Sequence, residues 1–365
     1  MKVFDKLGAL IGALPRALSS REEVDTLLEI AGRRRMPRLV LLTTNDEDER
    51  LLLRGLFEET DEPLTIREHE SDSPWSTVEI RGEKLALLKL RPVAAAAGRF
   101  RAALDHAPAD AILAFASVRD EAAVRQTILE MLNVSDPGEL SPASLVLLHS
   151  PNEEAGLEAR KAIKESFSTI GYGIYRVFIQ TESGVRSSLD GFSLLSDALV
   201  ELTELRIRLI LCRALPRSMK ARAELSDRMI DAFAAISGAV ALTPIPLADA
   251  AIITPLQGVM VGLIGYVSGR PMDRKTLGEA AASLGVVTAA GFGFRLIARQ
   301  AVKVVPGAGS AVAAAIALNG TKALGVAAKV YFLGERRGKG GARPIARLDA
   351  NSKTKSRGTL PNGRG

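Results

Sequence analysis

One stretch of this chain, residues 232–268, contains a single formally charged side chain, Asp249. A helix that spans a bilayer needs roughly 20 predominantly apolar residues. The stretch is therefore long enough for a spanning helix, or for a re-entrant hairpin that turns at Pro244 and Pro246. This block decides where the chain can reside, and so constrains its fold more than any other segment.

Two further apolar blocks follow, at residues 277–294 and 304–332. The last one contains Lys322 and Lys329, which weaken its prediction as a span; it could instead pack on the other blocks or line a polar interior. The chain is 47% hydrophobic but only 4% aromatic, and its 32 glycines suit helices that approach closely in lipid. We therefore expect helix contacts or turns at small residues and prolines of these blocks: Gly258, Gly262, Pro306, Gly307, Gly309, Gly320 and Gly325.

Asp249 has two interpretations. A carboxylate inside a membrane is by default a candidate functional group. Asp249 also follows Pro246 closely, and an aspartate at the start of a helix caps free N–H groups. The prolines favour the capping role, so we treat Pro244, Pro246 and Asp249 as structural candidates.

The net charge of +6 is concentrated on the two flanks of the apolar region, at residues 206–228 and after Gly334. Basic flanks are typical of the cytoplasmic side of a membrane. They would also suit RNA, but no aromatic residues are interleaved for base stacking, so a nucleic-acid partner is not expected. Both flanks in the cytoplasm require an even number of crossings, most simply two. The link at 269–276 is also basic, which favours the re-entrant alternative.

Two further sequence features limit the possible folds and locations of the chain less. Cys212 is the only cysteine, which excludes an intramolecular disulfide and favours a reducing compartment. The first residues place Phe4, Leu7, Ile11 and Leu14 at helical spacing, which predicts an amphipathic helix, either packed on the protein or lying in a membrane interface.

Residues 38–200 alternate short apolar runs with helical patterns. Continuous apolar strands separated by helices predict a mainly parallel sheet that is covered on both faces. The expected strands are 39–43, 77–80, 85–90, 111–116, 145–149 and 175–180, with a turn at Gly82. Helices are expected from about Leu51 to Phe57 and at 121–132 and 154–169.

The whole chain is thus predicted to be an α/β protein followed by an all-α, Ala/Gly-rich hydrophobic part. Five segments are expected: an amphipathic helical segment (1–37), the α/β domain (38–200), a basic helical connector (201–230), a hydrophobic membrane-associated domain (231–334) and a disordered basic tail (335–365).

The sequence resembles a bacterial family in which an uncharacterised hydrophobic domain follows an Era-like GTPase domain. The resemblance is carried by LTPIPLADAAIITPLQ (242–257), by RQAVKVVPGAGSAVAAAIA (299–317) and by TKALGVAAKVYF (321–332), in that order over about 110 residues. The element order of 38–200 resembles the GTPase domain itself. The resemblance implies a bacterial inner-membrane protein with a cytoplasmic GTPase-like domain and a cytoplasmic tail.

The phosphate-binding loop of such a domain would be G-x-x-x-x-G-K-[ST] after the first strand, where glycines let backbone N–H groups surround the phosphates. This chain has TTNDEDER there. Thr43 and Asp48 stand at the glycine positions, Glu49 at the lysine and Arg50 at the hydroxyl residue. The acids at 46–49 would repel a triphosphate, since one charge pair at 4 Å is worth about 4 kcal/mol at an effective dielectric of 20.

The other nucleotide motifs are also absent. LLKLRPVA (87–94) lacks the acid and glycine of D-x-x-G, and HSPNE (149–153) stands where N-K-x-D would be. Only QTESGVRSS (180–188) keeps the form of the last guanine loop. We therefore expect a GTPase-like domain without nucleotide, and no catalytic, cofactor or metal residues. The three histidines, His69, His106 and His149, have no metal-ligand spacing.

The sequence favours a non-enzymatic, membrane-associated scaffold or regulatory protein, with the bilayer as its main partner and possible self-association through the hydrophobic domain. Two alternatives stay open. One is an atypical GTP-binding protein that acts at the membrane. The other is a soluble interaction protein whose apolar blocks form a helical bundle.

Overall fold

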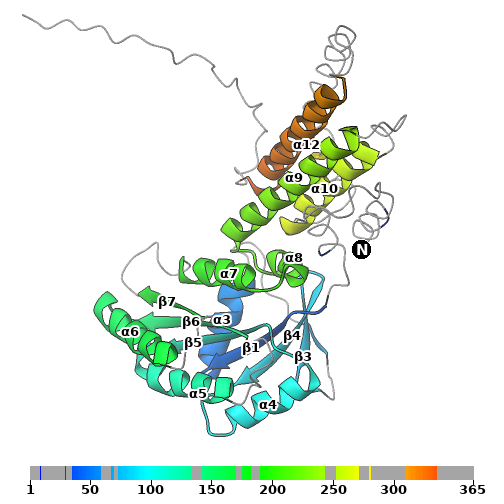
Figure 1. Ribbon diagram of the computed structural model, residues 1–365. Helices are drawn as coiled ribbons and strands as arrows, with labels where there is room; N and C mark the ends of the chain where they lie inside the picture. The colour runs from blue at the N-terminus through cyan, green and yellow to red at the C-terminus, as the bar shows by residue number, and fades with distance from the viewer. Residues whose placement is uncertain are drawn as a thin grey trace, which may run out of the picture. The chain divides into compact units, whose positions relative to one another are not determined.

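A computed structural model (Figure 1) describes residues 35–58, 67–69, 73–133, 142–169, 175–181, 190–242, 252–270, 279–280 and 309–334, together with Ala9 and Glu29. The predicted N-terminal amphipathic helix and the basic tail after Gly334 lie outside these residues. The described residues up to Leu333 belong to one compact unit.

The described strands form one mixed sheet of seven strands in the order β2-β3-β4-β1-β5-β6-β7. Neighbours from β4 to β7 pair in parallel, whereas β2 and β3 are antiparallel. The strands are β1 (Arg38–Thr43), β2 (Arg67–His69), β3 (Ser76–Ile80), β4 (Glu83–Leu90), β5 (Ala111–Ser117), β6 (Ala143–Ser150) and β7 (Tyr175–Thr181). The prediction of a mainly parallel α/β sheet is confirmed.

The turn between β3 and β4 lies at Arg81 and Gly82, whose φ angles are both positive, at 53° and 76°. Two consecutive positive φ values are typical of the tight hairpin turns that match strand twist. The turn predicted at Gly82 is therefore confirmed.

Helices cover both faces of the sheet (Figure 1). On one face, α4 (Ala96–His106), α5 (Glu121–Asn133) and α6 (Glu153–Thr169) pack on alternate residues of the central strands, such as Val40 and Ile112. On the other face, α3 (Asp46–Phe57) and α7 (Asp190–Leu202) pack on Leu39, Leu41 and Leu113. Because both faces are covered, β1 and β5 are buried along nearly their whole length.

The apolar core on the α3 and α7 face of the sheet does not end at the sheet. It continues through α8 (Leu205–Ala214) into α9 (Met219–Leu242), α10 (Thr254–Val267) and α12 (Gly309–Leu333). The helices of the apolar region and one face of the sheet therefore share a single buried apolar cluster within the unit of residues 1–333. The expected boundary at residue 231 falls inside α9, which is one continuous helix.

The first apolar block does not form one helix. It supplies the end of α9 and all of α10, with residues 243–251 between them outside the described part. Helix α12 is antiparallel to α9, because Lys322 pairs with Asp231 at 2.8 Å and Lys329 with Asp227 at 2.7 Å. These two ion pairs neutralise the two lysine charges that made the third apolar block a weaker candidate for a membrane-spanning helix.

Two glycines bring α9 and α12 together. A Cβ atom on Gly325 would lie 2.6 Å from Cγ1 of Ile230, and one on Gly238 would lie 3.2 Å from Cβ of Leu318. Both glycines therefore permit a close helix crossing. The contact expected at Gly325 is confirmed, whereas Gly238 was not singled out by the sequence.

Other expected packing positions differ. Gly258 is exposed, and a Cβ at Gly258 or at Gly320 would meet nothing within 4 Å among the described residues, so no helix contact is described at either glycine. Gly262 is buried in α10 and Gly309 begins α12. The remaining candidates lie outside the described residues: Pro244, Pro246, Asp249, Pro306 and Gly307.

The basic connector is partly internal. Arg222 is 4% exposed and donates hydrogen bonds to the backbone oxygens of Cys212 and Ser268, near the ends of α8 and α10. Arg217 donates to the backbone oxygen of Gly55 near the end of α3. Helix C-termini favour positive charge. The interpretation of these arginines as a solvated or lipid-facing flank is therefore wrong: they join helices to one another.

Candidate functional site

Ligands of open α/β sheets bind outside the carboxyl ends of the strands. At this edge β1 ends at Thr43 and leads through Thr44 and Asn45 into α3, while the neighbouring β4 ends at Leu90. The register pairs Leu42 with Leu90, so the next residue of the β4 chain, Arg91, lies beside Thr43. This is where the phosphate-binding loop of a GTPase-like domain would stand.

The N-terminus of α3 is capped by the protein itself. Asn45 has extended backbone angles, and its side-chain oxygen accepts a hydrogen bond of 2.8 Å from the backbone N–H of Asp48. The hydroxyl of Thr44 donates to the carboxylate of Asp48. Four acids, Asp46 to Glu49, occupy the first turn, where the helix dipole favours negative charge. Because Asn45 caps it and its first turn is acidic, this helix N-terminus is a poor binding site for an anion.

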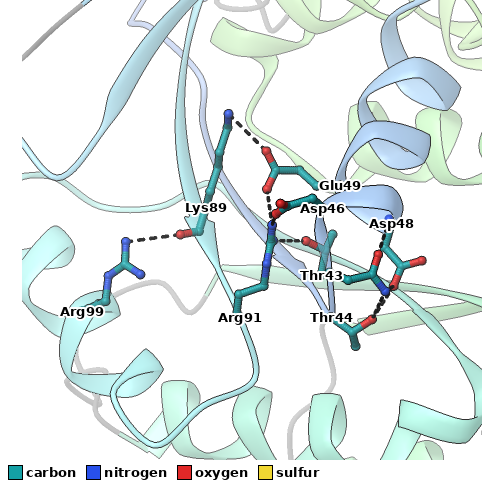
Figure 2. Close-up of polar contacts among 9 residues, drawn as sticks. Thr43, Thr44, Asp46, Asp48, Glu49, Lys89, Arg91 and Arg99 are labelled. Atoms are coloured by element: carbon teal, nitrogen blue, oxygen red, sulfur yellow. Dashed lines mark hydrogen bonds and ion pairs between the residues drawn. The ribbon is translucent and has the colours of Figure 1, made fainter.

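Arg91 crosses to this turn from the end of β4 (Figure 2). Its Nη2 lies 2.7 Å from a carboxylate oxygen of Asp46 and 2.7 Å from one of Glu49, and its Nη1 donates to the hydroxyl of Thr43. Lys89 adds a second cation, with its Nζ 3.2 Å from the other oxygen of Glu49. We call these residues the Arg91 cluster.

The ion pairs hold the guanidinium charged. Partial burial by itself lowers the pKa of Arg91, but hydrogen bonds to Asp46 and Glu49, and the charges of both carboxylates, outweigh that effect. The net result is a pKa above the ordinary arginine value. Glu49, with a side chain 16% exposed, is the best shielded carboxylate of the cluster.

The acids at 46–49 thus follow the first strand as the sequence indicated. They form the first turn of α3, which begins earlier than the expected start near Leu51, and two of them are paired with cations of the same chain. Sequence reasoning treated LLKLRPVA only as a motif without an acid and glycine, and so missed Arg91 and Lys89. The available signal was the adjacency of the first and third predicted parallel strands, whose carboxyl ends must meet at one edge of the sheet.

The segment HSPNE, where the resemblance to GTPase domains would put a guanine-binding motif, leads from β6 into helix α6. The hydroxyl of Ser150 donates to the backbone oxygen of Asn152 at 2.6 Å. The side chain of Asn152 in turn accepts from the backbone N–H of Ala155 at 2.9 Å, at the beginning of α6. These atoms satisfy local backbone groups. The loop at 182–189 lies outside the described residues.

Among the described residues, no group of three or more His, Cys, Asp and Glu side chains could hold a metal ion. Cys212 is buried, and desolvation raises the pKa of its thiol to about 12. A thiol with such a pKa is protonated at neutral pH and makes a poor nucleophile.

Helix α12 supplies the other surface of interest. Its segment Ala311–Leu333 is the one helix in the described part of the chain that is long and apolar enough to cross a membrane, and 28% of its most apolar window is buried. Four of its large apolar side chains are more than one-third exposed: Val312, Leu318, Val326 and Val330. Helix α10 is apolar but shorter.

No family model matches the chain, and no curated protein matches it.

Proposed function

We propose that this chain is a non-enzymatic, membrane-associated scaffold or regulatory protein whose α/β part is a GTPase-like domain that no longer binds nucleotide. The Arg91 cluster carries the proposal. A nucleotide needs free backbone N–H groups and a cation that faces the phosphates. Here an asparagine caps the helix, and the nearest arginine is held by two carboxylates.

The order of elements supports the GTPase-like part of the proposal. A buried strand and a helix are followed by three strands, β2, β3 and β4, paired antiparallel in succession, and then by helices and parallel strands in alternation. This is the order over 38–200 on which the resemblance to Era-like GTPase domains rests. The fold would then serve as a platform for partners, with its strand ends occupied by the protein's own side chains.

The exposed face of α12 supports membrane association. A core helix of a soluble protein is mostly buried, whereas α12 leaves large apolar side chains open. Where α12 pairs with α9, its two lysines meet aspartates, so the helix pair carries no net charge from these four residues. Neutral pairs lower the cost of placing charged side chains near a bilayer.

The nucleotide part is tested by titrating the full chain in detergent with GTP, GDP and ATP, each with magnesium, in a calorimeter. We expect no saturable heat. A micromolar dissociation constant for any of them would instead support the atypical GTP-binding alternative. The full chain is needed because the apolar core joins the sheet to α9 and α10.

The membrane part is tested by washing membranes from expressing cells with alkaline carbonate. We expect the chain to stay in the pellet. Release into the supernatant would support the soluble helical bundle and would leave the nucleotide result untouched, so the two halves of the proposal fail separately.

A further inference from the structure

Charge is divided sharply along the antiparallel pair of helices α9 and α12 (Figure 1). The ion pair between Lys322 and Asp231 marks one level of the pair. Beyond this level, toward the end of α9 and the start of α12, the described segments 232–242 and 309–321 contain no charged side chain. We call these two segments the uncharged end of the pair.

On the other side of this level, α9 carries charges that are open to solvent. Glu224, Asp227 and Arg228 are all exposed. Helix α12 by itself is long and apolar enough to cross a membrane, but Lys322 would then stand at the middle of the segment Ala311–Leu333. The charged half of α9 would have to enter the hydrocarbon beside the second half of α12. Because exposed charges are costly at that depth, the partner helix argues against a crossing.

Polar side chains near the uncharged end are bonded within the helices. Thr321 is buried, and its hydroxyl accepts a hydrogen bond of 2.9 Å from the side-chain amide of Gln257 in α10. The amide of Asn319 donates to the backbone oxygen of Ala315 at 2.8 Å. Such internal hydrogen bonds lower the cost of placing amides and hydroxyls in hydrocarbon.

The uncharged end has the surface and the length to enter about half of a bilayer. Leu242, Leu318 and Val312 are 49%, 38% and 37% exposed, so large apolar side chains are open to solvent on both helices. At about 1.5 Å per residue, segments 309–321 and 232–242 rise roughly 20 and 16 Å. The hydrocarbon core of a bilayer is about 30 Å thick. This end therefore matches one leaflet and is too short for the whole core.

We infer that the uncharged end enters one leaflet of a bilayer and does not cross to the other side. The ion pairs of Lys322 with Asp231 and of Lys329 with Asp227 then lie at the level of the headgroups. The inference rests on the membrane association proposed above and adds its depth and direction. With no helix crossing, both basic flanks of the apolar region stay on one side, and an even number of spans is not required.

The basic link that follows α10 agrees with this arrangement. Arg270, at its start, has its guanidinium 5.6 Å from the ring centre of Tyr331, near the end of α12 and on the charged side. In the sequence, Asp249 precedes Ile252 by three residues and Lys303 precedes Gly309 by six. At about 3.5 Å per extended residue, these stretches of chain are long enough for both charges to reach the headgroups.

The test measures depth in the full chain, in a Cys212→Ala background, bound to vesicles of anionic and neutral lipids. One fluorophore is attached to each of four single-cysteine variants at exposed positions of α12: Val312→Cys, Leu318→Cys, Val326→Cys and Val330→Cys. Lipids carry a quencher either near the headgroup or at the end of the acyl chain. We expect the ratio of deep to shallow quenching to fall steadily from position 312 to position 330. Val93→Cys, at a position 55% exposed in the α/β part, is the control and should be quenched by neither lipid.

A crossing helix would give a different pattern. Leu318 and Val326 are each four residues from Lys322, so labels there would be the deepest, whereas labels at positions 312 and 330 would both be shallow. That pattern, or shallow quenching at all four positions, would overturn the inference and leave membrane association standing. Absence of quenching at all four positions would overturn both, and would favour a protein partner for this end.

Val312→Asp provides a second readout of depth. An aspartate in the first turn of a helix is favoured by the helix dipole, so this variant should keep α12 folded. We expect it to lower the partition of the chain into vesicles at least about tenfold more than Val330→Asp does, because its charge must enter hydrocarbon rather than headgroups. Equal losses from the two variants would overturn the assigned depth.

Discussion

Arg91 shows how one side chain changes the meaning of a sequence pattern. Four consecutive acids at the start of α3 indicate strong negative charge. Yet Lys89, near the end of β4, and Arg91, just after it, reach Glu49 from 40 and 42 positions away in sequence. The identity of the acids and their place after the first strand could be predicted. Their partners could not, because pairing across a sheet depends on register, which here aligns Leu42 with Leu90.

We expect Arg91→Ala to lower the free energy of unfolding by about 1–2 kcal/mol, since it leaves the shielded Glu49 with only Lys89 as a partner. Thermal unfolding in detergent measures this change. Arg99→Ala is the control, because the contact of Arg99 is a long one of 3.4 Å to the backbone oxygen of Lys89. A loss from Arg99→Ala as large as that from Arg91→Ala would argue against the cluster as a stabilising unit.

Cys212 permits a prediction on alkaline stability. Burial raises the pKa of its thiol from 9.0 to about 12, so the folded state keeps its proton where the unfolded state loses it. The contribution is fully present below pH 9.0 and is lost as the pH rises toward about 12. Over this window stability should fall by up to about 1.4 kcal/mol per pH unit.

The measurement compares the pH dependence of unfolding for the parent chain and Cys212→Ala, whose curve should lack this slope. Iodoacetamide at pH 8 provides a second readout: the native thiol should react far more slowly than the thiol of the unfolded chain. Equal rates in the two states would contradict the burial of Cys212.

At the scale of elements, apolar runs were a reliable guide to the buried strands. The runs at 39–43, 111–116 and 145–149 all became strands, because both faces of the sheet are covered and the middle of each such strand is a continuous apolar run. β2 was not predicted, since REH has neither an apolar run nor alternation. The continuity of α9 was also missed, because its charged first half and apolar second half look like different segments although both favour helix.

Glycine positions were harder to interpret than strands. Spacing alone pointed equally to Gly258, Gly320 and Gly325, but only a crossing helix makes a glycine necessary. Gly325 meets Ile230, whereas a Cβ at Gly258 or Gly320 would meet no atom of the described residues within 4 Å. The sequence contains no sign of this difference, because it depends on which face of each helix meets a neighbour.

We expect Gly325→Ala to destabilise the α9–α12 pair by about 1–3 kcal/mol, because the new methyl group would overlap the branched side chain of Ile230. Gly320→Ala, on the same helix, should be neutral or should stabilise by up to about 1 kcal/mol through helix propensity. Thermal unfolding of both variants in the same detergent makes the comparison. If Gly320→Ala destabilises the chain as much as Gly325→Ala does, the close crossing of α9 and α12 does not explain the loss of stability.

For the whole molecule, the main departure from the sequence prediction is the shared core. Composition divides the chain sharply, since charge nearly disappears over residues 232–268, and this suggested a separate hydrophobic domain behind a basic connector. The folded chain instead uses arginines of that connector, such as Arg217 and Arg222, to bind backbone oxygens of neighbouring helices. A charge count treats every arginine as solvated, and so it overstated the basic flank available to a membrane surface.

The exposed apolar face of α12 is then the part of the molecule on which the proposed membrane association depends, and one substitution tests that proposal. Val330 on α12 and Val93 in the α/β part are both 55% exposed, so an aspartate at either position meets the same degree of solvent. A charged side chain that must enter lipid costs about 2.5–3.5 kcal/mol near the bilayer centre and less toward the interface. We therefore expect Val330→Asp to reduce the fraction of the chain that floats with anionic vesicles by severalfold, while Val93→Asp leaves it unchanged. Circular dichroism checks that both variants keep their helices. If Val330→Asp floats as the parent chain does, this face of α12 does not contact lipid, and the membrane part of the proposal loses its main structural support.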